Sequence, residues 1–352
     1  MISARLIVHG QLFNNGKLPV GPYSSLLVRI ADNSAEVGVT RCIRFMSAYT
    51  VIVMLQLTEK ACLQDIIPPN DISDEEAYAI LHSLDISKNR LGSDPEGIYP
   101  PPVWRISPDT VLKRTDGAHF EPFTMLLVST MTTIPVPRVR KYVTWNSDVW
   151  VFMEYIGGRN LEEAWPSLSV FKKLWIIWKL RDYVHQLRRI PLAEPRTPGP
   201  VDGSGKPQRC IGYYFTELSA GPFASYAELT AWYDKRAEIA VRLNHLACEA
   251  SGKAPSLSLK NLVFDDSAPL VLTHGDITPR NVILGDDGRL WLVDWGFSGV
   301  YPSWLEYACM AAYRNASAPR LWRWSVPLVT GWYPSQLSYL QALGEALMLY
   351  DI

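Results

Sequence analysis

Residues 273–294 constrain the possible folds of this chain more than any other stretch. They contain two short apolar runs on either side of Gly285-Asp286-Asp287-Gly288, which is a turn signal of the Asp/Gly kind. This pattern predicts an antiparallel hairpin. Such a hairpin brings Asn281, which precedes the first strand, close to Asp294, which follows the second. Asp276 lies five residues before Asn281.

An aspartate, an asparagine and a second aspartate in this order suit phosphoryl transfer from a nucleotide. Asp276 can accept or orient the proton of an attacking hydroxyl, while oxygens of Asn281 and Asp294 hold the magnesium ions that neutralise the phosphates. Taken singly, each residue has a plainer explanation, because aspartate and asparagine beside a turn are commonly capping or surface residues. Their combination at fixed offsets favours the functional interpretation.

These residues resemble the catalytic loop and metal-binding motif of the protein-kinase-like superfamily. The likeness is greatest to the aminoglycoside phosphotransferase-like family, in which His-Gly-Asp, as at 274–276, replaces the His-Arg-Asp of protein kinases. Asp-Trp-Gly, as at 294–296, replaces Asp-Phe-Gly. The resemblance implies an α+β, two-lobed protein-kinase-like fold with a small antiparallel-sheet N-lobe and a mostly helical C-lobe. It also implies ATP and Mg2+ as cofactors.

The segment before the motif supplies candidates for the small lobe. The pattern predicts two strands at 103–107 and 110–113, the second ending at Lys113. A helix is expected over about 119–131, with Glu121 in its first turn, where the helix dipole favours a carboxylate. The resemblance implies that Lys113 pairs with Glu121 and binds the α- and β-phosphates. A solvent-exposed lysine and a capping glutamate are the simpler alternatives.

An apolar strand followed by a double glycine predicts the end of this lobe. The resemblance makes 154–158 the hinge, in which backbone groups of Glu154, Tyr155 and Ile156 bind the adenine edge. Protein kinases cover the phosphates with a glycine-rich loop, whereas the corresponding turn at 107–110 contains no glycine. This departure leaves the affinity for a triphosphate open.

Long amphipathic helices are expected in the second lobe, at 167–190 and 226–250. The first is expected to bury one apolar stripe, made of Phe171, Leu174, Trp175, Trp178, Leu180, Val184 and Leu187. His185, on the same helix, is interpreted as a packing residue. The second helix belongs to the insert that covers the acceptor pocket in the resembling family. Its acidic side chains are therefore candidate acceptor contacts, although a solvated helix face explains them equally well: Glu228, Asp234 and Glu238.

The segment after Asp294 is expected to hold two helical stretches, at about 302–314 and 334–350. It is too short for the activation segment and further helices with which a protein kinase binds a peptide. The expected acceptor is therefore a small hydroxylated molecule, and a protein kinase is disfavoured.

Composition excludes several classes of function. A net charge of −1 over 352 residues provides no basic excess for a nucleic acid. Five cysteines without a CxxC pair favour a reducing compartment. A cytoplasmic location is expected, with a mitochondrial one as the alternative because the first 31 residues carry basic but no acidic side chains. The longest apolar run, 45–57, is too short to span a bilayer. The sequence does not identify protein partners.

Three parts are therefore expected: an N-terminal extension at 1–70, for which poor order is one expectation, an N-lobe at 71–156, and a C-lobe at 159–352. The leading hypothesis is an ATP- and Mg-dependent phosphotransferase acting on a hydroxyl of a small molecule. The alternative is a non-catalytic kinase-like module with a nucleotide-binding or regulatory role.

Overall fold

The protein forms two compact units in the computed structural model, Met1–Cys62 and Leu63–Ile352. In the first unit, only the backbone of three short antiparallel strands is described, namely β1 (Arg5–Val8), β2 (Gln11–Phe13) and β3 (Val28–Arg29). In the second unit, the described residues are 71–85, 88, 90–91, 103–115, 120–192, 196–215, 219–252, 262–313 and 319–347. The expectation of poor order in 1–70, and the expected start of the N-lobe at residue 71, stay predictions, because most of 1–70 lies outside the described residues.

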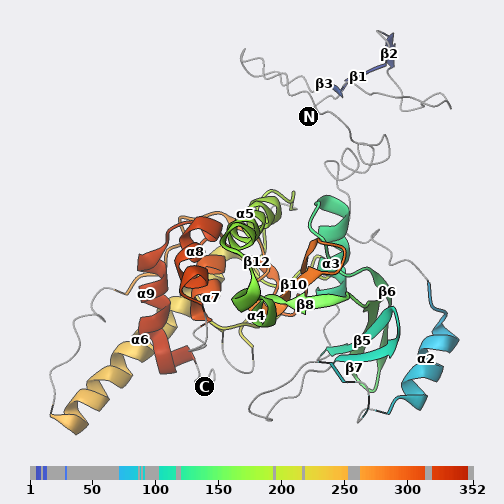
Figure 1. The fold of residues 1–352 in the computed structure, drawn as a ribbon. Helices are drawn as coiled ribbons and strands as arrows, with labels where there is room; N and C mark the ends of the chain where they lie inside the picture. The colour runs from blue at the N-terminus through green and yellow to red at the C-terminus, as the bar shows by residue number, and fades with distance from the viewer. Residues whose placement is uncertain are drawn as a thin grey trace. The chain divides into compact units, whose positions relative to one another are not determined.

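A four-stranded antiparallel sheet of order β4-β5-β7-β6 forms the N-lobe (Figure 1). Its strands are β4 (Val103–Ser107), β5 (Thr110–Thr115), β6 (Val139–Trp145) and β7 (Asp148–Glu154). Helix α2 (Asp74–Ser83) begins after Ser73, whose hydroxyl caps it by accepting the backbone N–H of Glu76 at 3.1 Å. Leu81 of this helix packs against one face of the sheet. The mixed α+β, two-lobed prediction is confirmed.

The opposite face of the sheet packs on helix α3 (Phe120–Met131). This helix is buried from Phe120 through Val128, whereas Thr130 near its end is exposed. The Thr130 hydroxyl instead donates to the Leu126 carbonyl at 2.8 Å. The expected start at residue 119 lies outside the described residues.

The C-lobe is mostly helical, as predicted (Figure 1). Its helices are α4 (Leu161–Ala164), α5 (Val170–Leu187), α6 (Tyr226–Ser251), α7 (Leu305–Ala312), α8 (Arg320–Thr330) and α9 (Pro334–Leu343). Single 3-10 turns are η2 (Trp165–Ser167), η4 (Pro279–Asn281) and η5 (Gly344–Leu347). Among the described helices, none is long and apolar enough to cross a bilayer.

Two small sheets lie among these helices. One has the order β11-β10-β8, with β8 (Gly158–Asn160), β10 (Val282–Gly285) and β11 (Leu290–Leu292). The other pairs β9 (Leu270–Thr273) with β12 (Gly299–Pro302). A helix was predicted to begin at about residue 302. Pro302 is instead the last residue of β12, and α7 begins at Leu305. Helix α8 was not predicted, because it contains Pro327 and a proline inside a segment normally argues against a helix.

The predicted stripe on α5 is wrong in its first half. The side chains of Phe171, Leu174 and Trp178 are 85%, 50% and 69% exposed, and Trp175 is only partly buried. The buried face carries Ile176, Ile177, Leu180, Tyr183, Val184 and Leu187, so the second half of the prediction is confirmed. The first half of this helix is apolar on nearly every side, and hydrophobic spacing alone cannot then select the face that packs.

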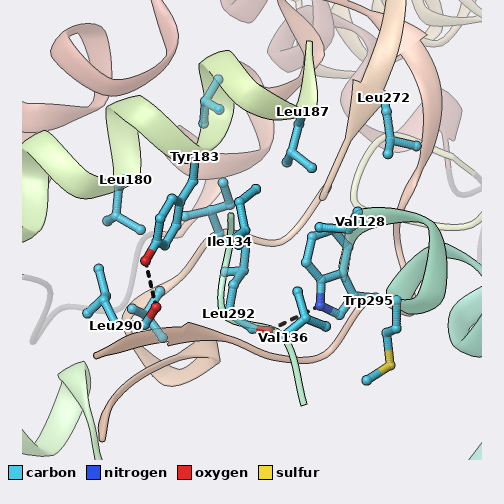
Figure 2. Packing of buried hydrophobic residues seen from close by; sticks show 14 of the residues in the cluster. Val128, Ile134, Val136, Leu180, Tyr183, Leu187, Leu272, Leu290, Leu292 and Trp295 are labelled. Atoms are coloured by element: carbon cyan, nitrogen blue, oxygen red, sulfur yellow. Dashed lines mark hydrogen bonds between the residues drawn. The ribbon is translucent and has the colours of Figure 1, made fainter. Parts of the chain in front are cut away.

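One apolar cluster joins both lobes and supports the predicted hairpin (Figure 2). Its members include Val128, Ile134, Val136, Leu180, Tyr183, Leu187, Leu272, Leu290, Leu292 and Trp295. The Tyr183 hydroxyl donates to the Leu290 carbonyl at 2.8 Å, and the Trp295 indole N–H donates to the Leu292 carbonyl at 3.2 Å. Fully burying such a side chain contributes about 1.5–3 kcal/mol. The cluster therefore fixes Trp295, and with it the neighbouring Asp294, relative to α3 and α5.

Candidate active site

The predicted hairpin is present and sets two polar residues side by side. Strands β10 and β11 pair antiparallel with Val282 opposite Leu292, and the backbone N–H of Val293 donates to the Asn281 carbonyl at 3.0 Å. Asn281 and Asp294 therefore lie at the same end of the hairpin. Asp294 has a φ of 65°, which is rare for a residue other than glycine and turns the chain sharply after β11.

Three charged side chains from distant segments meet beside this end. The Lys113 ammonium lies 2.6 Å from Glu121 Oε1 and 2.7 Å from Asp294 Oδ1. Glu121 also accepts the backbone N–H of Trp295 at 3.2 Å. Burial alone would lower the pKa of Lys113, but the two carboxylates outweigh it and hold this pKa above its usual value. The structure thus brings together the lysine, the glutamate and the second aspartate of the predicted site.

Asp276 lies at the other end of the site, with both oxygens occupied. Its Oδ2 accepts the Asn281 side-chain N–H at 2.7 Å and an Arg280 N–H at 3.1 Å, while its Oδ1 accepts the Tyr213 hydroxyl at 2.8 Å. The side chain is buried. Burial raises the pKa of Asp276 to about 6, although Arg280 and Tyr213 oppose the shift.

His274 supports the backbone of this loop as a neutral residue. The Asp276 backbone N–H donates to His274 Nδ1 at 3.2 Å, so the ring proton resides on Nε2, which donates to the Val293 carbonyl at 3.2 Å. Burial lowers the pKa of His274 to about 4. The next residue, Gly275, has a φ of +77°, and a Cβ there would lie 2.4 Å from the Phe297 carbonyl oxygen. Glycine is therefore required at this position.

Glu306 is a residue that the sequence interpretation missed. It lies on α7, accepts the backbone N–H of His274 at 2.7 Å and that of Gly275 at 3.2 Å, and is 2% exposed. Burial raises the pKa of Glu306 to about 7, although both N–H groups favour the charged form. The available signal was a lone charged residue in an otherwise apolar helix. Two more missed residues, Tyr213 and Arg280, contact Asp276 directly.

The end of the hairpin offers oxygen atoms that suit a magnesium ion. The Asn281 side-chain nitrogen donates to Oδ2 and to the backbone carbonyl of Asp276, at 2.7 and 3.1 Å, so its amide oxygen points the other way. Within the described part of the chain, that amide oxygen and Asp294 Oδ2 have no hydrogen-bond partner. Among the same residues, no three histidine, cysteine, aspartate or glutamate side chains form a metal cluster. This pair fits an ion that fills its remaining positions with phosphate and water oxygens.

The expected hinge lies at the end of β7. Two of its backbone N–H groups already donate to other parts of the N-lobe, so they are not free to donate to an adenine. The Glu154 N–H donates to the Arg138 carbonyl and the Tyr155 N–H donates to the Asp109 carbonyl, each at 2.9 Å. The Ile156 N–H has no hydrogen-bond partner among the residues that the structure describes. Among the N–H groups of Glu154, Tyr155 and Ile156, the N–H of Ile156 is therefore the one that remains available to a ligand.

The glycine-free turn between β4 and β5 is closed by its own side chains. The Asp109 carboxylate accepts the hydroxyls of Ser107 and Thr110 at 2.7 and 3.0 Å and an Arg140 N–H at 2.8 Å. The Ser107 hydrogen bond and Arg140 lower the pKa of Asp109 to about 2. A fixed turn therefore stands where protein kinases have a glycine-rich loop.

The acidic residues of α6 are not brought to Asp276. Glu228 accepts the Ala224 N–H at 2.7 Å at the start of the helix, which is a capping arrangement. Asp234 and Glu238 are exposed. His185 lies on α5 and is partly buried. Among the hydrogen bonds and ion pairs of the described residues, none joins these four side chains to Asp276.

Comparisons with known proteins identify a family and several similar solved structures. The family model described as APH, phosphotransferase enzyme family, matches residues 123–342, more than half of the chain. The gentamicin complex of APH(2")-IIa is 14% identical, with 77% of this chain and 86% of that chain covered and a TM-score of 0.47. Aminoglycoside phosphotransferase APH(3'')-Id from Streptomyces rimosus ATCC10970 is 17% identical, with 79% and 100% covered and a TM-score of 0.43.

Macrolide 2'-phosphotransferase MphH from Brachybacterium faecium is 16% identical, with 77% of this chain and 90% of that chain covered and a TM-score of 0.43. No curated protein sequence matches the chain significantly. The match of the family model over 123–342 is sufficient on its own: the chain belongs to the APH phosphotransferase enzyme family.

Proposed function

We propose that the protein is an ATP- and Mg-dependent phosphotransferase that transfers the γ-phosphoryl group to a hydroxyl of a small molecule. One observation carries this proposal. The side-chain nitrogen of Asn281 donates to Asp276. The backbone carbonyl of Asn281 accepts the N–H of Val293, the residue before Asp294. A candidate base and a candidate metal site are thereby linked through a single residue, as phosphoryl transfer requires.

The proposed nucleotide side consists of Lys113, Glu121, Asn281 and Asp294. Lys113 would bind the α- and β-phosphates, and Glu121 would hold its ammonium in place. The amide oxygen of Asn281 and Oδ2 of Asp294 would hold magnesium, which when bound neutralises charge on the β- and γ-phosphates. The Ile156 N–H would donate to the adenine edge.

The proposed acceptor side is Asp276. With a pKa of about 6, its carboxylate is mostly ionised at neutral pH and can accept the proton of the attacking hydroxyl. Asn281 and Arg280 both bind Oδ2, so the carboxylate cannot rotate freely. Oδ1 is then the oxygen that faces the acceptor.

A non-catalytic nucleotide-binding module remains the second candidate. Two observations favour it: the Tyr213 hydroxyl already occupies Oδ1 of Asp276, and the turn over the expected phosphate position has no glycine. Such a module would bind ATP with magnesium without consuming it in the presence of any acceptor. The complete set of lysine, aspartate, asparagine and aspartate favours the enzyme.

Nucleotide binding can be tested by thermal shift with ATP, with and without magnesium. We expect ATP with magnesium to raise the melting temperature of the wild type and to have little effect on Lys113→Ala. Lys141→Ala is a matched control, because Lys141 is also a partly buried lysine of the same sheet, paired with Asp74 at 2.6 Å. Equal stabilisation of Lys113→Ala and the wild type would contradict the proposed nucleotide site. ATP consumption is then measured across a panel of hydroxylated metabolites. An enzyme should consume ATP with at least one of them, whereas a non-catalytic module should consume none.

A further inference from the structure

Tyr213 approaches Asp276 from a segment outside the catalytic loop. Its hydroxyl donates to Asp276 Oδ1 at 2.8 Å and accepts an N–H of Arg280 at 3.1 Å. A general base lies about 2.6–3.2 Å from the oxygen whose proton it removes. The tyrosine hydroxyl thus makes the same contact with Asp276 that an acceptor hydroxyl must make.

The two oxygens of Asp276 are held in different ways. Oδ2 is bound by Arg280 and Asn281, which follow Asp276 within five residues and belong to the same loop. Oδ1 is bound by Tyr213, 63 positions earlier in the sequence. A tyrosine side chain can rotate away from Oδ1 without changing the loop that holds Oδ2. Oδ1 is therefore the oxygen that can exchange partners.

The backbone around Tyr213 is anchored on both sides. Cys210 and Ala220 exchange two backbone hydrogen bonds, at 2.7 and 2.9 Å, and these fix the chain three residues before Tyr213. The adjacent Tyr214 hydroxyl donates to the Ala308 carbonyl at 3.1 Å, and the Tyr214 carbonyl accepts the Tyr233 hydroxyl at 3.0 Å. The placement of Tyr213 over Asp276 is thus built into the fold.

The ring of Tyr213 also meets the metal-binding motif. It packs edge-on against Phe297, with ring centroids 5.6 Å apart, and Phe297 follows Asp294 by three residues. Arg280, whose side chain is 51% exposed, donates to the Tyr213 hydroxyl and so connects this contact to the surface. Water reaching Oδ1 from that side would compete with an acceptor for the phosphoryl group.

From this geometry we infer that Tyr213 is a positioning residue that occupies the acceptor place on Asp276 and excludes water from it until an acceptor hydroxyl displaces the tyrosine. The inference rests on the proposed function. The reaction that Tyr213 suppresses is hydrolysis of ATP. In that reaction the water oxygen bonds to the γ-phosphorus, the bond between the γ-phosphorus and ADP breaks, and the water proton passes to Asp276.

The test is the release of inorganic phosphate from ATP by the full-length protein, with magnesium and without any acceptor. Tyr213→Phe should increase the rate of phosphate release about tenfold or more. Losing one hydrogen bond to a charged group changes the population of the state with Oδ1 occupied by about this factor. Tyr226→Phe is the matched control, because its hydroxyl donates only to the Ala268 carbonyl, and its rate should equal that of the wild type. The double variant Tyr213→Phe, Asp276→Asn should return to background.

A gain in rate separates this role from a structural one, since a loosened fold would lose activity. A rate for Tyr213→Phe at or below the wild type, with ATP-induced thermal stabilisation retained, would overturn the inference and leave the proposed function standing. Phosphate found on Tyr213 by intact-protein mass spectrometry would also overturn it, since the tyrosine would then be the acceptor. Absence of ATP-induced stabilisation in the wild type would overturn the proposed function and this inference together.

Discussion

The two ends of the candidate site are built on different physical principles. At one end, the Lys113 ammonium lies between the carboxylates of Glu121 and Asp294, at 2.6 and 2.7 Å, and pairs with both. At the other end, Asp276 is buried beside a partly exposed Arg280 and two neutral donors, Tyr213 and Asn281.

The difference is visible in the pKa values of the two aspartates. Burial alone would raise both, but Lys113 outweighs it at Asp294 and holds that pKa below its usual value. At Asp276 the opposing groups are weaker, and the pKa rises to about 6. A permanently charged carboxylate suits a metal ligand, whereas one with a pKa near neutrality suits proton transfer. The first three of the four predictions that follow test this division, and the fourth tests a buried carboxyl beside it.

The largest expected effect is at the acceptor end. Asp276→Asn keeps the shape of the side chain but cannot take up a proton, so phosphoryl transfer should fall by roughly 10²–10⁴. ATP binding should be nearly unchanged, because the lysine end is intact. Turnover measured beside a thermal-shift titration with ATP tests both points. Turnover comparable to that of the wild type would remove Asp276 from the mechanism.

Asp294→Ala should affect the end of the site that is proposed to hold magnesium. It removes a charged oxygen ligand and a partner of Lys113, so the magnesium concentration for half-maximal activity should rise by at least about tenfold, the lower bound seen when groups around a metal are lost. Titrating magnesium at fixed ATP measures this midpoint. An unchanged midpoint would mean that Asp294 serves only the turn after β11.

The pH dependence of transfer distinguishes the two aspartates without mutation. The active form of Asp276 is the ionised one, so the rate should fall as the pH drops through about 6, by about tenfold per pH unit below that value. The pKa of Asp294 is lowered, so it should remain ionised over the same range. A rate that stays constant down to pH 5, under conditions where the protein remains folded, would contradict the assignment of Asp276.

Glu306 should affect stability more than chemistry. Its pKa of about 7 in the folded state exceeds the usual 4.5, so the folded protein retains this proton while the unfolded chain loses it. Its contribution to stability is therefore complete below pH 4.5 and declines as the pH rises to about 7, by roughly 3 kcal/mol at most. Glu306→Gln should remove this slope. Urea unfolding of both proteins at pH 5 and pH 7 tests the prediction, and parallel changes in the two would refute it.

The sequence was sufficient for those parts of the site whose signals are local. The hairpin that joins Asn281 to Asp294 follows from two apolar runs and a turn. Lys113 was expected on a strand and Glu121 in the first turn of a helix, and both lie there, but the strand was expected to end at Lys113 and β5 continues to Thr115. The pairing of Lys113 with Glu121 was expected only from the resemblance, and the ion pair of Lys113 with Asp294, 181 positions away, was not predicted.

The remainder depended on packing that a single sequence does not reveal. The face of α5 that is buried and the contact of Tyr213 with Asp276 are each decided by segments far away along the chain. Arg280 and Glu306 did carry weak signals. Arg280 lies within the motif itself, four residues after Asp276, and Glu306 is the lone charge of α7.

The central claim is that Asp276 and Asp294 divide proton transfer and metal binding in one phosphotransferase site. The most direct measurement is transfer of the γ-phosphoryl group of ATP to a panel of small hydroxylated molecules, followed by mass spectrometry of the products. The account predicts a phosphorylated acceptor with the wild type and magnesium, and its loss without magnesium, in Asp276→Asn and in Asp294→Ala. A phosphorylated acceptor formed equally well by Asp276→Asn, or by the wild type without a divalent ion, would contradict it.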